Sequence, residues 1–545
     1  MKIRRNIAIL AMMLCTIPSF SQEGFFHIYP SGGSKFASSC AIETNDGSFI
    51  VAINDNLYGT GYSGSVMLLK LSAEGEVADS VIVDESNDYY TIDKLFRHPI
   101  DQNFFIGIGQ YGFQDSVPTP FGFSLPYLVH FDDQLNITLR KTIEQPEYFH
   151  RKCIYNQKTM LNMDRNLFCE LAYFTPTIPA SDFRRIFTEM SLDGDFLRIV
   201  EDPDTIGLQN YGNSTLAVFH FPVTHEIGML CHGRPEMTPG HVGQIHKLFK
   251  LDDDFETEEL NELYRFGDDT LAYNSNHIHI RFNVLDLSSS DVLPLDDSTL
   301  LFSMRADANS YQWWYVVDSN LFVIDPSAVM FKTDLEGNME DFYIVKSYND
   351  SIEAVPATSV ALTKKDATGH RYIYHCCYSQ YQELWENPNT LTLTKLTDDF
   401  EVIWQKSYTV PDVYLEAHHL ITTSDGGCLV VGSVTRGCNL PYSFGEREEW
   451  FALKLNADGT LGTDELSVRD ELYGYPNPVK DVLHVGCPQG SKPTAIELYD
   501  LQGRLVRTQR TGLESIDMSQ LPAGTYTMRV ALEDGKVFSD KIMKQ

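Results

Sequence analysis

A sequence pattern of alternating apolar residues recurs about every sixty residues along this 545-residue chain, and it constrains the fold more than any other feature. Most copies end in a cation and an apolar residue, and a polar turn follows, often with Asp-Gly or consecutive Asp. One residue near the end of each copy serves as its anchor, and the anchors are Lys70, His130, Glu189, Lys250, Lys332, Lys395 and Lys454. Short apolar runs between tight polar turns predict β-hairpins rather than helices.

A second sequence pattern alternates with the first and consists of a polar turn followed by a continuous apolar strand. Its clearest copies are residues 45–52 and 424–432. Each unit is too small to bury both faces of its own strands, so neighbouring units must stack on one another. The chain is therefore predicted to be all-β, with a seven-bladed β-propeller over residues 22–468 built from seven repeats.

The interval between Lys250 and Lys332 is the longest in the series and indicates an insertion near residues 255–292. The extra segment includes His277 and His279, and also an acidic stretch over residues 252–259. An insertion in one blade usually becomes a loop on one face, where propellers place recognition.

Residues 1–21 read as a secretory signal, with Lys2, Arg4 and Arg5 before a short apolar run. The mature chain is expected to begin at Gln22. The large residues before Cys15 disfavour lipid attachment there. No later stretch has the length of apolar sequence that a membrane helix needs, so the mature chain is expected to lack a transmembrane segment and to be soluble.

The formal net charge is −33, from 75 acidic and 42 basic residues. A field of this sign repels phosphate backbones, which excludes a general nucleic-acid binder. Nearly all of the acidity belongs to the predicted propeller. Many Asp residues stand in Asp-Gly turns, where hairpin geometry explains them, with calcium binding as the alternative.

Cofactor and metal motifs are missing from the sequence: it has no CxxC pair, EF-hand loop or glycine-rich phosphate loop. We therefore expect no cofactor and no metal. Nine cysteines remain after removal of the signal, and they are interpreted as small packing residues, with room for one or two disulfides. Their pairing stays open.

The final segment, residues 469–545, changes in composition and is nearly neutral. Short strands alternate in period two over its length, which predicts a small Ig-like β-sandwich. Three separated motifs stand out in it: Tyr-Pro-Asn-Pro at 475–478, Leu-Tyr-Asp-Leu-Gln-Gly-Arg at 498–504, and the run 516–526, before a Lys-rich end. With these motifs, the segment resembles the C-terminal sorting domain of the type IX (Por) secretion system of Bacteroidetes.

This resemblance implies that the segment is a targeting signal recognised by the type IX secretion machinery. That machinery is therefore an expected partner of the chain. It implies passage across the outer membrane, followed in many cases by removal of the domain, and a secreted or outer-membrane surface location. The residues that carry the sorting motif are Pro476, Asn477, Pro478, Tyr499, Asp500, Gly503, Asp517, Leu521, Pro522, Gly524, Tyr526, Lys541 and Lys544. None of them is expected to be catalytic.

Three functions remain open for the propeller from sequence alone. The first is a surface or secreted module that binds glycan or protein, for which the aromatic run 311–315 offers stacking groups, although core packing also explains it. The second is an extracellular carbohydrate-active hydrolase or lyase with paired carboxylates at the propeller axis. The third is a structural role at the cell surface.

Candidate histidines for the second function are His277, His279, His418 and His419. In a strand, the first two share a face and have the spacing of a metal-ligand pair. No third ligand stands at a recognisable spacing, and no catalytic residue can be assigned.

Overall fold

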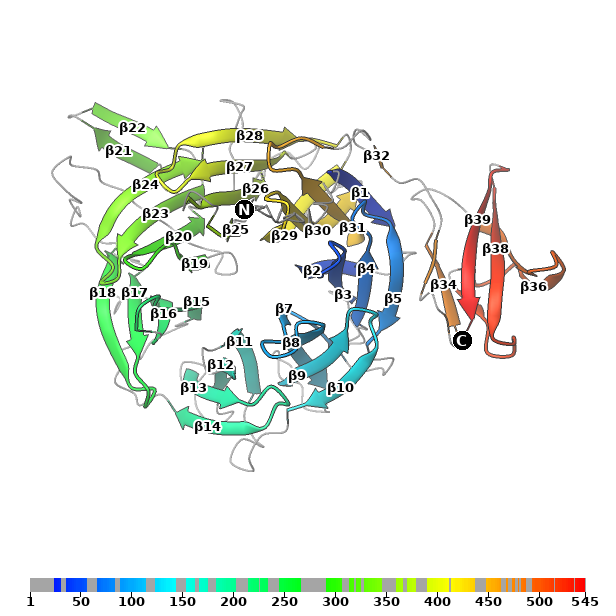
Figure 1. The fold of residues 1–545 in the computed structure, drawn as a ribbon, viewed down its shortest axis with the longest axis horizontal. Helices are drawn as coiled ribbons and strands as arrows, with labels where there is room; N and C mark the ends of the chain where they lie inside the picture. Colours follow the sequence, from blue (N-terminus) through cyan, green and yellow to red (C-terminus); the bar gives the residue numbers. More distant parts are fainter. Residues whose placement is uncertain are drawn as a thin grey trace, which may run out of the picture.

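The computed structural model describes the chain over residues 24–30, 36–55, 66–83, 89–113, 123–143, 153–161, 166–174, 183–201, 214–224, 226–233, 245–265, 291–305, 313–317, 320–324, 328–345, 359–365, 370–378, 390–410, 413–436, 447–461, 467–468, 473–475, 479, 482–486, 493–513, 515–533 and 535–544. Within these ranges every regular element is a β-strand (Figure 1). None of the described residues forms a helix long and apolar enough to cross a membrane.

Seven antiparallel sheets form a ring, which confirms the predicted all-β propeller (Figure 1). Blade one holds β2 (Phe36–Glu43), β3 (Phe49–Asp55), β4 (Val66–Leu71) and β5 (Val77–Ile82). Blade two holds β6 (Tyr89–Tyr90), β7 (Lys94–Arg97), β8 (Phe104–Phe113), β9 (Phe123–Asp132) and β10 (Ile137–Thr142). Blade three holds β11 (Cys153–Leu161), β12 (Leu167–Phe174), β13 (Phe183–Met190) and β14 (Phe196–Glu201).

The remaining blades repeat this up-and-down order. Blade four holds β15 (Ser214–His220), β16 (Ile227–Gly233), β17 (Ile245–Leu251) and β18 (Thr257–Arg265). Blade five holds β19 (Asp291–Pro294), β20 (Thr299–Arg305), β23 (Ala328–Asp334) and β24 (Met339–Val345). Blade six holds β25 (Ser359–Leu362), β26 (Tyr372–Tyr378), β27 (Leu391–Thr397) and β28 (Val402–Tyr408). Blade seven is built from β29 (Val413–Thr422), β30 (Cys428–Arg436) and β31 (Arg447–Leu455), with two further strands at its outer edge.

The strand that closes the ring comes from the start of the chain. β1 (Phe25–Pro30) pairs antiparallel with β31, with Ile28 opposite Phe451, and so completes the last blade. The short β32 (Ser467–Val468) pairs in parallel on its outer side. Side chains of β1 alternate between two interfaces: Phe26 and Ile28 pack with blade six, while Phe25 and Tyr29 pack with blade one. The two ends of the propeller sequence are therefore held in one sheet.

An additional hairpin interrupts blade five. β21 (Trp313–Val317) and β22 (Asn320–Ile324) pair with each other and lie in sequence between β20 and β23. This hairpin adds to the long interval between Lys250 and Lys332, but it lies after the segment near 255–292 in which the insertion was predicted. Of the predicted insertion itself, residues 266–290 lie outside the described part of the chain.

Apolar side chains between adjacent blades form the core. In blade three, for example, Phe168 and Phe187 are completely buried and meet Phe255 of blade four edge-on. In blade five, Phe302 and Phe331 stack with ring centroids 4.7 Å apart. Central strands are buried on both sides, because each blade is covered by its two neighbours, and this explains the continuous apolar runs in the sequence.

The C-terminal region forms two small sheets that pack face to face. One contains β33 (Tyr473–Tyr475), β34 (Val482–Gly486) and β37 (Ser515–Asp517). The other has the order β36 (Leu505–Gln509), β35 (Pro493–Asp500), β38 (Gly524–Leu532) and β39 (Val537–Lys544). Their common core includes Leu483, Ile516, Leu498 and Val530. This is the β-sandwich that the period-two alternation predicted.

Candidate functional site

The two faces of the propeller are built from different kinds of connection. Within each antiparallel blade, the first and third turns lie at one end of the strands, and the second turn and the link to the next blade lie at the other. Most connections at the first end are short, as in residues 44–48, 72–76, 423–427 and 456–460. Most connections that start from the opposite end are longer, as in residues 56–65, 234–244, 266–290 and 346–358. The exceptions are residues 363–371 at the first end and residues 409–412 at the second. We refer to the two ends as the short-turn face and the long-connection face.

On the short-turn face, the turn that follows the third strand of each blade contains a residue with positive φ, and this residue always lies five positions after the anchor. It is glycine in four blades and a larger residue in three. These residues are Gly75, Leu135, Gly194, Phe255, Gly337, Phe400 and Gly459. Where it is larger, the side chain is buried, as in Leu135, Phe255 and Phe400. Where it is Gly459, Trp404 of the preceding blade occupies the space, since a Cβ there would lie 2.8 Å from the indole ring.

The Asp residues of these turns bind the turn itself. Asp132 Oδ1 accepts hydrogen bonds from the backbone N–H groups of Gln134 and Asn136, at 2.9 and 2.8 Å. Asp334 does the same for Glu336 and Asn338. Such carboxylates replace water as partners of turn amides, so their role is to fix the hairpin. Much of the acidity of the propeller is explained in this way.

The anchor residues join one blade to the next. Lys70 Nζ donates to the carbonyl of Asp133 at 2.9 Å, Lys332 Nζ to that of Asp398 at 2.9 Å, and Lys395 Nζ to that of Ala457 at 2.8 Å. His130 Nε2 lies 2.8 Å from the carbonyl of Leu192 in the same arrangement. Each acceptor carbonyl belongs to the residue three positions after the anchor of the next blade. In these four blades the anchor is thus an inter-blade contact, whereas Lys250 pairs with Glu226 and Glu258 of its own blade.

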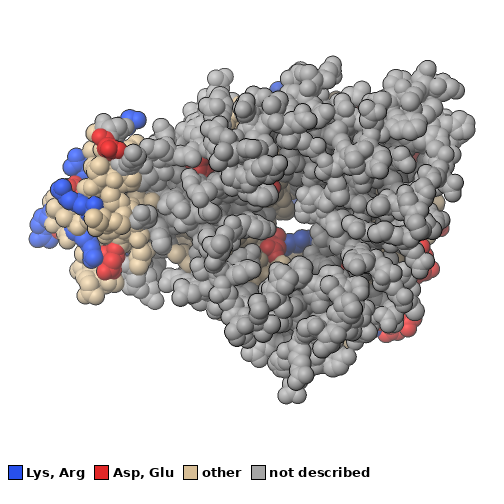
Figure 2. All heavy atoms as spheres, turned by 180° about the vertical axis from the view of Figure 1, so that it is seen from behind, with Lys and Arg blue, Asp and Glu red and all other residues tan. Residues whose placement is uncertain are grey.

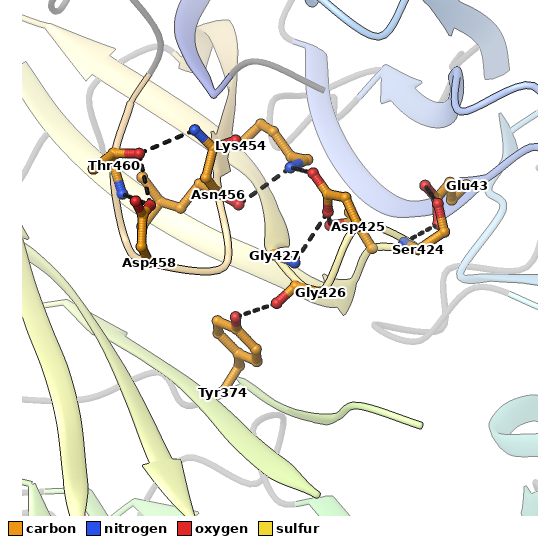
Figure 3. Close-up of polar contacts among 12 residues, drawn as sticks. Glu43, Tyr374, Ser424, Asp425, Gly426, Gly427, Lys454, Asn456, Asp458 and Thr460 are labelled. Carbon is orange, nitrogen blue, oxygen red and sulfur yellow. Dashed lines mark hydrogen bonds and ion pairs between the residues drawn. The ribbon is translucent and has the colours of Figure 1, made fainter. Parts of the chain in front are cut away.

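Blade seven carries a completely buried lysine at this face (Figure 3). Lys454, whose side chain has 0% exposure, donates to Asp425 Oδ2 at 2.7 Å. Asp425 also accepts from the hydroxyl of Thr423 and from the N–H of Gly427. Burial opposes the ionised carboxylate, but the hydrogen bonds from Lys454 and Thr423, with the charge of Lys454, outweigh it and lower the pKa of Asp425. The equivalent pair in blade one, Lys70 and Asp46, is more exposed.

The turn that contains Asp425 is held from both neighbouring blades (Figure 3). Tyr374 of blade six donates its hydroxyl to the carbonyl of Gly426 at 2.5 Å. The Glu43 carboxylate of blade one accepts from the N–H and hydroxyl of Ser424, at 2.8 and 2.7 Å. All of these donors and acceptors are therefore engaged with the protein itself. The turn around Asp425 is thus fixed by hydrogen bonds within the protein.

Two of the four candidate histidines lie in the described part of the chain, on the innermost strand of blade seven. His419 accepts a hydrogen bond from the N–H of Ala41 in blade one, 3.2 Å from its Nδ1. Burial, aided by the charge of Lys94, lowers its pKa to about 4. His419 therefore helps to close the ring as a neutral imidazole. The other two, His277 and His279, lie outside the described residues.

His418 lies near a serine and a carboxylate but does not form a catalytic triad with them. Its Nε2 is 3.2 Å from Ser433 Oγ and 3.9 Å from Glu416 Oε1. In a triad the carboxylate orients the opposite ring nitrogen, which leaves Nε2 for the nucleophile. Here both groups meet the same nitrogen, and Ser433 is buried. This arrangement does not support acyl transfer.

The other sequence candidates for ligand contact are only partly described. Within the aromatic run 311–315, residues 313–315 belong to β21, and the first two lie outside the described residues. Within the described residues, no group of three His, Cys, Asp or Glu side chains is arranged to hold a metal ion. Figure 2 shows an opening through the middle of the ring, with acidic and basic side chains at its wall.

Six cysteines in the described part of the chain are buried free thiols: Cys40, Cys169, Cys231, Cys376, Cys377 and Cys428. Burial raises the pKa of Cys169, Cys377 and Cys428 to about 12. Such thiols are not reactive nucleophiles near neutral pH, and they pack as small apolar residues.

The described residues of the sorting motif lie in turns and strands of the sandwich, and one of them, Tyr526, belongs to its core. Asp500 Oδ1 accepts from the N–H groups of Gln502 and Arg504, and Gly503 between them has φ 74°. Tyr499 and Lys541 stand in one row across the sheet, each paired with Thr527. Figure 1 draws the sandwich beside the ring.

The later motif residues fix the connection that leads into β38. Asp517 accepts from the N–H of Ser519 at 2.8 Å, and the N–H of Leu521 donates to the carbonyl of Met518. Tyr526 is buried and donates its hydroxyl to the carbonyl of Pro522 at 2.7 Å. Two further motif residues stand opposite each other, Gly524 at the start of β38 and Lys544 at the end of β39. Residues 476–478, with Pro476, Asn477 and Pro478, lie outside the described part of the chain.

Solved structures with similar architecture are β-propeller proteins of low sequence identity. A prolyl endopeptidase is 12% identical with a TM-score of 0.34, and the match covers 74% of this chain and 47% of that protein, about half its length. A leech intramolecular trans-sialidase is 9% identical with a TM-score of 0.36, and the match covers 80% of this chain and 68% of that protein. An ulvan lyase of polysaccharide lyase family 25 is 10% identical with a TM-score of 0.35, and the match covers 78% of this chain and 91% of that protein. No curated protein matches the chain with significant sequence similarity.

The C-terminal region has a family match. Residues 474–545 match the model of the secretion system C-terminal sorting domain, the Por secretion tail. This range spans the sandwich and the three motifs from which the sequence predicted it. The domain implies interaction with the type IX secretion machinery and a secreted or cell-surface location. The chain is therefore a secreted β-propeller protein that carries a type IX sorting domain at its C-terminal end.

Proposed function

We propose that the propeller is the delivered part of the protein and acts as a secreted or cell-surface module that binds a glycan or a protein ligand with its long-connection face. The observation that carries this proposal is the difference between the two faces. In the described turns of the short-turn face, many donors and acceptors are engaged within and between blades, as in the network around Asp425. The opposite ends of the same rigid strands lead into longer and more varied connections, and such segments on a rigid scaffold usually carry binding.

The composition of the long connections supports this assignment. Residues 56–65, 202–213 and 306–315 are rich in Tyr, Asn, Ser and Gly. The same residue types dominate antibody binding loops, since Tyr supplies contact area with few rotatable bonds and Ser, Gly and Asn supply adaptable hydrogen bonds. A net charge of −33 suits an extracellular body that stays soluble, and it excludes nucleic acid as the ligand.

Catalysis by carboxylates at the axis, the alternative drawn from the sequence, has less support. Glycoside hydrolysis needs two carboxyl groups at a defined separation around one bond. Among the described residues, the acidic side chains with resolved roles cap turns or pair with cations, as do Asp132, Asp334 and Asp425. We therefore propose a binding protein and assign no catalytic residue.

Binding of the secreted protein to glycan arrays and to extracellular matrix proteins tests this proposal. We expect at least one ligand with a Kd of about 1 mM or tighter, the weak end of measurable specific association. Replacing residues 234–244 or 56–65 by a two-residue Asn-Gly turn should weaken binding. The matched control replaces Glu74 with Gln in an exposed turn of the opposite face and should leave binding unchanged. Cleavage of the bound glycan would instead establish an enzyme.

A further inference from the structure

The sandwich of the sorting domain has one covered edge and one open edge. On the covered edge, Val479 forms a parallel bridge to Lys544 of β39 and donates its N–H to the carbonyl of Met543 at 2.7 Å. At the opposite edge β36 pairs with β35 only, and no strand in the described part of the chain pairs with its outer side. An unpaired edge presents backbone donors and acceptors that another chain can pair with, and folded proteins usually blunt or cover such edges.

Large apolar side chains are exposed along the open edge. Leu501 has 75% exposure, Leu505 51% and Val506 38%. Leu501 stands at the tip of the β35–β36 turn, which the Asp500 carboxylate holds through Gln502 and Arg504. Three exposed apolar residues thus lie within six positions, one in this turn and two at the start of β36, and such a patch points to a partner.

Arginines flank the apolar residues of this edge. Arg504 and Arg507 are partly neutralised, by Asp500 at 2.7 Å and by Asp517 at 3.3 Å. Arg510 is exposed at the end of β36. Figure 1 places β36 on the side of the sandwich away from the ring, and Figure 2 shows Lys and Arg gathered at that end of the molecule. The patch is thus basic, although the propeller is strongly acidic.

We propose that the β36 edge, defined by Leu501, Arg504, Leu505, Val506, Arg507 and Arg510, is the docking surface of the sorting domain and receives an extended segment of the export machinery. The segment adds a strand next to β36, and it carries Asp or Glu opposite the arginines and apolar residues opposite Leu505 and Val506. Main-chain hydrogen bonds supply affinity in such strand addition, and alternate side chains supply specificity. This inference rests on the export role of the domain.

An anionic lipid surface would also attract a basic and apolar patch, but a strand partner fits the observations better. Lipid recognition does not use the backbone groups of an open edge, and the opposite edge of the same sheet is covered by Val479. Pairing along β36 gives a role to both the open backbone and the exposed side chains.

Export of the full chain with paired substitutions tests the proposal. L505K/V506K places two cations in the apolar part of the edge, and R510E reverses an exposed charge. Both should reduce the protein at the cell surface and in the medium at least tenfold and leave it in the periplasm. The matched controls V537K and K536E change exposed residues of β39 or beside it and should be exported normally. Unchanged thermal unfolding of the sandwich shows that each variant folds.

The outcomes separate this inference from the export role itself. If deletion of residues 474–545 blocks export and L505K/V506K and R510E do not, the β36 edge is not the docking surface. If the deletion also leaves export unchanged, both the export role and the docking surface are wrong. If the full chain sediments with phosphatidylglycerol vesicles and R510E abolishes this, the surface reads lipid and the strand partner is overturned. Loss of export with both variants and normal export of both controls supports the proposal.

Discussion

At the scale of single residues, the anchor position of each blade explains much of the polar contact within the propeller. In four blades the anchor side chain contacts a backbone carbonyl of the next blade, whereas in blade seven Lys454 forms a buried ion pair within its own blade. Sequence periodicity located these cations. It did not identify their partners, because each acceptor lies more than fifty residues away and belongs to a main-chain carbonyl that carries no sequence signal.

The buried pair in blade seven should be far more sensitive than its counterpart in blade one. Lys454→Ala leaves the Asp425 carboxylate buried without its cation, and we expect the free energy of unfolding to fall by about 3–5 kcal/mol. Lys70→Ala is the control, because Asp46 has 55% exposure and retains water as a partner. That variant should lose only about 1 kcal/mol. Urea unfolding of both variants measures the difference, and equal losses would contradict this account.

A second residue should make stability depend on pH. His375 in blade six is completely buried, and neither ring nitrogen has a hydrogen-bond partner. Burial lowers its pKa from 6.5 to about 3. The unfolded chain binds a proton below pH 6.5 and the folded chain does not until about pH 3, so stability falls as the pH decreases through this window.

His375→Leu removes this dependence, since a leucine at this position has no proton to bind. Strand register places Phe302 at the corresponding position of blade five, so an apolar residue fits there. Between pH 7 and pH 5 the native protein should lose about 2 kcal/mol more than the variant. Unfolding midpoints at the two pH values measure this, and parallel pH profiles would show that His375 does not bind a proton on unfolding.

At the scale of elements, the ring is closed by a strand that the repeat did not reveal. β1 precedes the first complete repeat and is not followed by the polar turn of the repeat, so its spacing did not mark it as part of blade seven. The reason for its alternating apolar residues is visible only in the folded chain. There Phe26 and Ile28 face blade six, and the rings of Tyr29 and Trp450 stack with their centroids 3.9 Å apart.

Closure by β1 makes this strand critical for the whole propeller. Ile28→Asp buries a carboxylate between blades six and seven, and we expect a loss of at least about 3 kcal/mol, with faster proteolysis of the chain. Val77→Asp is the matched control on the outer strand of blade one, where the side chain is exposed, and it should change stability by less than about 0.5 kcal/mol. Limited proteolysis at equal rates would argue against closure by β1.

The sequence predicted the turns well where the local residue type determines the backbone conformation. Gly47, Gly75 and Gly459 all mark turns with positive φ. The sequence was less informative where packing between blades determines the conformation. Leu135, Phe255 and Phe400 adopt the same positive φ without being glycine, because burial of their side chains between blades offsets the backbone strain. The β21–β22 hairpin was not predicted, because the insertion was placed near residues 255–292 and the aromatic run 311–315 was interpreted as stacking or core residues.

At the scale of the whole molecule, charge separates the two parts of the protein. The propeller holds nearly all of the net charge of −33, and the sorting domain is close to neutral with a basic end. Sequence motifs identified the sorting domain because its motifs are local and ordered. The ligand of the propeller could not be predicted in the same way, because the long connections of different blades meet only in the folded ring and share no motif.

The central claim is that the last domain directs an intact propeller out of the cell, and fractionation of the producing bacterium tests it most directly. The full chain and a chain that ends at residue 473 are compared in periplasm, on the surface and in the medium. We expect the full chain on the surface or in the medium, and the shortened chain folded and protease-resistant in the periplasm. Export of the shortened chain at the level of the full chain would contradict the claim.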